Sequence, residues 1–105
     1  MTTAPDGTVT ILVTQRVLPG KEAELEGILR TSMERTLADD EGCLRYEWYR
    51  SSEPQTYMLF ERWTSQAAVE AHLATPRMKA MFESRQAIAP EKFSYAYLVE
   101  LGQTA

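Results

Sequence analysis

Residues 43–63 read CLRYEWYRSSEPQTYMLFERW and contain two runs of alternating large side chains. Alternation with a period of two is typical of β-strands, and it predicts one strand over residues 43–50 and another over residues 57–63. The segment between them, SSEPQ at residues 51–55, is rich in turn-forming residues. Because this connection is short, we expect the two strands to form an antiparallel hairpin.

A strand and a helix are predicted before this hairpin. Residues 8–18 alternate in the same way, and Pro19-Gly20 ends that strand. Apolar residues then recur every three or four positions over residues 21–38, which is the pattern of an amphipathic helix. The acidic segment DDEG at residues 39–42 is expected to be a loop.

Two helical segments and a last strand are predicted after the hairpin. Hydroxyl side chains at residues 64–65 can cap a helix over residues 66–74. Thr75 can cap a second segment over residues 76–86, which begins with a proline at its first position. Alternation returns over residues 93–101 and predicts the final strand.

The predicted order is therefore strand, helix, strand, strand, helix, strand. This βαββαβ order is that of the ferredoxin-like fold, an α+β fold in which the helices cover one face of a four-stranded antiparallel sheet. Large side chains occur on both faces of the hairpin strands, with Tyr46 and Trp48 on one face and Tyr49 on the other. A solvated face would be polar, so we expect the second face to be covered by another copy in a homodimer. The alternative is a monomer with aromatic side chains at its surface.

Length and charge limit the classes of function. A chain of 105 residues with 44% hydrophobic content suits one domain over residues 8–101, with flexible ends at residues 1–7 and 102–105. The net charge is -4, and the 11 basic residues are scattered among 15 acidic ones. Nucleic-acid binding is therefore not expected.

Cysteine and histidine usage limits the cofactors. Cys43 is the only cysteine and His72 the only histidine, which excludes a disulfide within the chain and metal sites that need several such ligands. Residues 1–7 have no pattern of a secretion signal, and no run of about eighteen apolar residues occurs. We expect a cytoplasmic protein that does not enter a membrane.

One face of the strand over residues 57–63 carries the candidate site. Its side chains are Tyr57, Leu59, Glu61 and Trp63. If this face meets the helices, these side chains line an apolar pocket together with His72 and Leu73. A carboxylate beside an imidazole fixes the ring and favours its charged form, so Glu61 is expected to orient His72 as a general base. A purely structural bond between Glu61 and His72, and a purely structural Trp63, remain alternatives.

Four segments together resemble the antibiotic-biosynthesis-monooxygenase (ABM) family. They are Gly20 after a strand that ends in Leu-Pro, EGCLRY at residues 41–46, FERW at residues 60–63 and EAHLATPRMKA at residues 70–80. The last segment is similar to that of bacterial quinol monooxygenases. The resemblance covers nearly all of residues 8–101 and implies a dimeric α+β barrel. It also implies oxidation of quinols or anthrone-like polyketides by O2 without metal or flavin, although other branches of the family degrade haem or catalyse isomerisation.

The chain departs from several branches of this family. Quinol-oxidising relatives commonly have a second histidine where Arg77 stands, so His72 would act alone. Anthrone-oxidising relatives use an Asn and a Tyr where this chain has Leu59 and Val69. Haem-degrading relatives have a Trp in place of His72 and a His in place of Phe82.

The sequence and the resemblance together predict a cofactor-independent monooxygenase that oxidises a small hydroquinone or polyhydroxylated aromatic with O2. His72 would be the base, Glu61 its orienting partner, and Arg77 the group that stabilises the anion, although a surface position is the commoner fate of an arginine. The walls of the substrate slot would be Trp63, Tyr57, Leu59, Leu73 and Phe82. An isomerase in the same pocket and a non-catalytic dimeric binding module are the alternatives.

Overall fold

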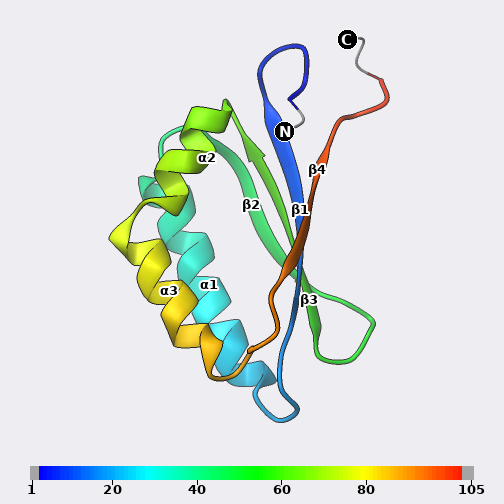
Figure 1. Cartoon of the computed structure of the whole chain (residues 1–105), viewed down its shortest axis with the longest axis vertical. Helices are drawn as coiled ribbons and strands as arrows, with labels where there is room; N and C mark the ends of the chain where they lie inside the picture. The colour runs from blue at the N-terminus through cyan, green and yellow to red at the C-terminus, as the bar shows by residue number, and fades with distance from the viewer. Residues whose placement is uncertain (1–2, 103–105) are drawn as a thin grey trace.

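The computed structural model describes residues 3–102. Its strands are β1 (Val9–Arg16), β2 (Cys43–Arg50), β3 (Thr56–Trp63) and β4 (Ser94–Leu98), and its helices are α1 (Glu22–Asp39), α2 (Gln66–Leu73) and α3 (Pro76–Gln86). The strands pair antiparallel in the order β2-β3-β1-β4. The helices lie together on one side of this sheet (Figure 1). The predicted α+β, ferredoxin-like arrangement is confirmed.

The observed bounds differ from the predicted ones mainly at two places. β4 ends at Leu98, although alternation continues to residue 101, because its neighbour β1 pairs with it only over residues 10–14. α1 continues through Asp39, one residue into the predicted loop. Of the predicted flexible ends, residues 1–2 and 103–105 lie outside the described part.

Hydroxyl caps start both helices that follow the hairpin. The side chain of Ser65 accepts a hydrogen bond of 3.1 Å from the backbone N–H of Ala68 at the start of α2. Thr75 does the same for the N–H of Met78 at 3.2 Å, and Pro76 occupies the first position of α3. These caps satisfy N–H groups that a helix cannot pair internally. They also fix the short break that separates the two helices.

One parity of β1, β2 and β3 faces the helices and forms the core. The odd-numbered residues of β3, from Tyr57 to Trp63, are buried, and Tyr46 and Trp48 of β2 pair with Glu61 and Leu59 on the same face. The buried cluster at the end of the sheet nearer α2 consists of Val9, Ile11, Val13, Tyr46, Leu59, Trp63 and Val69. The strand parity predicted from the sequence therefore places these side chains on the correct face.

The other face of the sheet has no helix over it. Phe60 lies near its middle, opposite Leu12 of β1 and Glu47 of β2. The Arg45 guanidinium lies 4.5 Å from the centroid of the Phe60 ring, and Tyr49 is 52% exposed. In the described part of the chain, the helices are too short or too polar to span a membrane.

Candidate active site

The turn between α1 and β2 sets the position of Asp40. Gly42 has a φ of +82°, and a Cβ atom there would lie 2.6 Å from Thr64 Oγ1 and 2.8 Å from the Cβ of Ala68. Glycine is therefore required both by the backbone conformation and by the close approach of the next helix. The N–H of Asp40 still donates to the carbonyl of Thr36 at 3.1 Å, which keeps Asp40 against the end of α1.

Asp40 joins three helices through its carboxylate. Its Oδ2 lies 2.5 Å from Nδ1 of His72 on α2, and its Oδ1 accepts a bond of 2.5 Å from Nη2 of Arg77 on α3. Arg77 also donates to Oγ1 of Thr36 on α1 at 3.1 Å. Burial opposes ionisation of Asp40, but the hydrogen bonds from Arg77 and His72 outweigh it and hold the pKa of this carboxyl below its ordinary value.

His72 is a buried imidazole whose neutral form is favoured by its surroundings. Burial lowers its pKa below the ordinary value, and the hydrogen bond and charge of Asp40 offset only part of that effect. Because ionised Asp40 can only accept, Nδ1 carries the proton and Nε2 is left able to accept one. The ring is packed against Trp63 and Tyr46, with centroid distances of 4.8 Å and 5.3 Å.

Glu61 is a second buried ionisable group at this place. It is 7% exposed, and its Oε1 accepts a hydrogen bond of 2.9 Å from the indole N–H of Trp63. Burial raises the pKa of Glu61 to about 7. The hydrogen-bond partner of His72 is thus Asp40 and not the predicted Glu61. The reason is that the indole N–H of Trp63 donates to Glu61, while the end of α1 places Asp40 beside the histidine.

Glu61 and His72 line the same small cavity between the sheet and the helices, with a volume of about 40 Å³. Its other lining residues are Val13, Tyr46, Trp48, Leu59, Leu73, Met78, Met81, Phe82, Arg85 and Phe93. The cavity therefore has apolar walls, apart from a few polar or ionisable groups. In such surroundings, charged forms are disfavoured and hydrogen bonds are strong.

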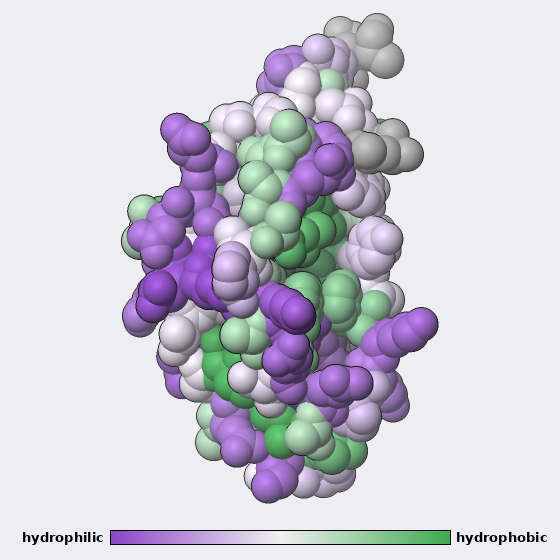
Figure 2. Space-filling view, turned by 60° about the vertical axis from the view of Figure 1, so that its left-hand side comes forward, coloured by the Kyte–Doolittle hydropathy of each residue, from purple (hydrophilic) through white to green (hydrophobic). Residues whose placement is uncertain are grey.

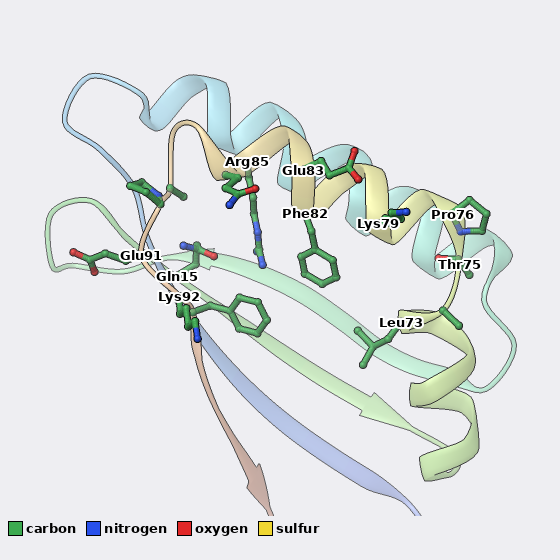
Figure 3. A pocket seen from close by; sticks show the side chains of 15 residues that line it. Gln15, Leu73, Thr75, Pro76, Lys79, Phe82, Glu83, Arg85, Glu91 and Lys92 are labelled. Atoms are coloured by element: carbon green, nitrogen blue, oxygen red, sulfur yellow. The ribbon is translucent and has the colours of Figure 1, made fainter.

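A larger groove opens beside this cavity, with a volume of about 810 Å³. It lies between α3 and the segment that leads into β4 (Figure 3). Leu73, Phe82, Arg85 and Phe93 line both the groove and the cavity, so the two spaces adjoin. Figure 2 shows apolar surface gathered at a hollow in the middle of this side of the molecule, with hydrophilic residues around it.

The predicted site residues are only partly brought together. Leu59, Leu73 and Phe82 line the cavity with Glu61 and His72. Trp63 is buried behind His72 and Glu61.

Two predicted site residues lie elsewhere. Tyr57 is buried at the far end of β3, where its hydroxyl donates to Glu26 at 2.6 Å. Arg77 does not line the cavity, because its guanidinium is bonded to Asp40 and Thr36. In this arrangement its guanidinium supports Asp40.

Two residues that the sequence analysis missed belong to this site. Asp40 stood in a run of acidic residues, and nothing local distinguished it from its neighbours. Arg85 is 5% exposed and follows Met81 and Phe82 by four and three positions, so it is a charged residue in the apolar stripe of α3. That interruption of the stripe was the available signal.

Among residues 3–102, no group of three or more His, Cys, Asp or Glu side chains is placed to hold a metal ion.

The sequence matches the family model described as antibiotic biosynthesis monooxygenase over residues 8–84. The chain belongs to this family. The resemblance seen in the sequence motifs is confirmed at the level of the family. A search of proteins with curated functions finds no match to the sequence of this ABM-family protein.

Several solved structures are similar to this ABM-family protein. A Caulobacter crescentus CB15 protein that carries the family name is 28% identical, with a TM-score of 0.85 over 92% of this chain and 94% of the other. A Pseudomonas aeruginosa protein is 23% identical, with a TM-score of 0.81 over 90% and 95% of the two chains. A Mycobacterium tuberculosis protein is 20% identical, with a TM-score of 0.82 over 94% and 100%. The last two likenesses support the fold alone.

The role of Asp40 can be tested on His72 directly, because a single histidine gives a single set of ring resonances. We expect His72 to titrate below the ordinary pKa of about 6.5. In Asp40→Asn the pKa should fall further, since the charge that stabilises the imidazolium is lost. NMR titration of the ring protons measures both values. Asp39→Asn removes an exposed carboxylate next door and should leave the titration unchanged. A higher pKa in Asp40→Asn than in the wild type would contradict this account.

Proposed function

We propose that this ABM-family protein is a monooxygenase that oxidises a small hydroquinone or polyhydroxylated aromatic with O2 and without a bound cofactor. The observation that carries the proposal is the buried His72 ring, held by Asp40 at the wall of a small apolar cavity. A quinol supplies its own electrons, so the protein needs only a base and a site that excludes water. His72 would supply the base, and the apolar walls of the inner cavity would limit access of water to it.

The proposed reaction begins with proton transfer from a ring hydroxyl to Nε2 of His72, and Asp40 stabilises the imidazolium. The phenolate passes one electron to O2, and the resulting semiquinone and superoxide combine at a ring carbon. His72 returns its proton to the peroxide, and loss of water leaves the hydroxylated quinone. In overall balance, hydroquinone and O2 give hydroxyquinone and water. No outside reductant is consumed.

The two adjoining spaces suggest how substrate and oxygen are arranged. The inner cavity, at about 40 Å³, is far smaller than the roughly 150 Å³ of a protein cavity that accepts benzene. The ring would therefore occupy the groove of about 810 Å³ and direct a hydroxyl toward His72. Rotation of Leu73 or Phe82, which line both spaces, would join them. The inner cavity remains large enough for a small molecule such as O2.

Glu61 favours a second candidate function, isomerisation by proton transfer. A carboxyl whose pKa lies at about 7 can give or take a proton at neutral pH, and His72 on the same cavity can do the reverse. Such an enzyme would exchange substrate C–H hydrogen with solvent deuterium and consume no O2. A non-catalytic binding module would show neither activity.

The base can be tested by O2 uptake with a panel of quinols. His72→Ala should lower kcat/KM on the order of a hundredfold, because a general base contributes at least that factor. Val69→Ala is the matched control, since Val69 is buried on the same helix and does not line the cavity. It should lower the melting temperature while the rate per folded molecule stays near that of the wild type. Full activity per folded molecule in His72→Ala would refute the assignment of the base.

We also propose that two copies pair through the uncovered face of the sheet. Of the two tyrosines that could meet a partner, Tyr46 is buried against the helices and Tyr49 is exposed on the uncovered face. Phe60 and Leu12 are cross-strand neighbours at the middle of this face. Apolar side chains in such a position favour association, and a domain of this size gains stability from a partner.

Phe60→Glu should dissociate this dimer, because it replaces the apolar ring at the middle of the interface by a carboxylate, whose burial is costly even beside Arg45. Analytical ultracentrifugation at micromolar concentration measures the change. Leu37→Glu is the control, since Leu37 is 53% exposed on α1, away from the sheet. It should leave the dimer intact. A wild-type protein that sediments as a monomer would contradict the proposal.

A further inference from the structure

Arg85 is a buried cation without an acidic partner. Every other arginine in residues 3–102 has a carboxylate oxygen within 4.0 Å, and those arginines are exposed or only partly buried. Arg85 is 5% exposed and has no ion pair in the same part of the chain. A charge removed from water in this way is costly unless a group of opposite charge meets it. The burial of Arg85 therefore points to a partner that is not part of the protein.

Two aromatic rings surround this cation. The guanidinium carbon lies 4.8 Å from the centroid of the Phe82 ring and 4.6 Å from that of Phe93. The two rings are nearly parallel, with an angle of 8° and a centroid distance of 5.9 Å. Contact with ring faces fixes the guanidinium in place but brings no negative charge. Arg85 thus remains free to meet an anion.

The direction of Arg85 connects it with the proposed active site. Its side chain extends from α3 toward the sheet, beside Phe82 (Figure 3). It lines both the open groove and the inner cavity that contains Glu61 and His72. An anionic group bound to Arg85 would therefore hold an attached ring at the junction of the two spaces, close to the proposed base.

We propose that Arg85, Phe82 and Phe93 bind the carboxylate of an aromatic substrate, so that the substrate class is a hydroquinone or polyhydroxylated aromatic that bears a carboxylic acid. The proposal rests on the proposed function for the identity of the ring. A carboxylate is ionised at pH 7, whereas a phenol, with a pKa of about 10, is not. The planar guanidinium also matches the two oxygens of a carboxylate.

Binding can be measured without turnover by calorimetry under anaerobic conditions, with gentisate and hydroquinone as the probes. Gentisate is hydroquinone with a carboxylate on the ring, so the pair differs in that group alone. The wild type should bind gentisate at least tenfold more tightly than hydroquinone. Arg85→Met keeps an unbranched apolar stem, loses the guanidinium and its charge, and should abolish this preference.

Lys79→Met is the matched control. Lys79 lines the same groove but is exposed, so its loss removes the same charge from the groove and should change the gentisate preference by less than about twofold, given the screening of exposed charges. Melting curves show whether each variant is folded, and Arg85→Met should be as stable as the wild type or more so, because an unpaired buried charge is removed.

Equal affinity of the wild type for the two probes, or an unchanged preference in Arg85→Met, would overturn the proposal. The outcomes also separate it from the proposed function. Gentisate binding that depends on Arg85, without O2 uptake on any quinol, would support the carboxylate site and refute the oxidation. O2 uptake with hydroquinone, without a preference for gentisate, would support the oxidation and refute the carboxylate site.

Discussion

The hydrogen bond between Asp40 and His72 is the contact on which the proposed chemistry of this protein depends. The two residues are 32 positions apart in the chain, and the bond ties the end of α1 to α2. Arg77 occupies the other oxygen of Asp40 and adds α3 to the same junction. One carboxylate thereby orients the histidine ring, selects its tautomer and holds together the helices that close the cavity.

The cavity also combines two groups whose pKa values are shifted in opposite directions by the same cause. Burial raises the pKa of Glu61 to about 7 and lowers that of His72. Burial thereby favours the uncharged form of both groups, as expected in an apolar cavity. A buried carboxyl and a buried imidazole on the same cavity suit catalysis of proton transfer.

Strand and helix periodicity was sufficient to predict the fold but not all of the site. Alternation placed Tyr57, Leu59, Glu61 and Trp63 on one face, as observed. It could not show how far the site extends along the strand. Tyr57 lies four residues from Glu61, or about 13 Å at the rise of a β-strand, and so reaches a different part of the core.

The identity of the partner of His72 depended on tertiary structure. Asp40 reaches the histidine because α1 ends where it does and because Gly42 turns the chain with a positive φ. Neither feature distinguishes one acidic residue of that loop from the next in the sequence. Arg85 was within reach of sequence reasoning, since a charge among Met78, Met81 and Phe82 on one helix face needs an explanation.

The central claim, that the cavity is apolar enough to raise the pKa of Glu61 to about 7, is tested by the pH dependence of stability in Glu61→Gln. Glutamine imitates the protonated carboxyl and can still accept the bond from Trp63. Because the pKa of Glu61 in the folded protein lies above that in the unfolded chain, wild-type stability should fall as the pH rises from about 4.5 to 7. Measured by denaturant unfolding, the two proteins should be equally stable near pH 4. Above pH 7 the free energy of unfolding of the variant should exceed that of the wild type by up to about 3 kcal/mol, which is the free-energy equivalent of raising the pKa of Glu61 from 4.5 to about 7. A difference that is constant across this range would contradict the account.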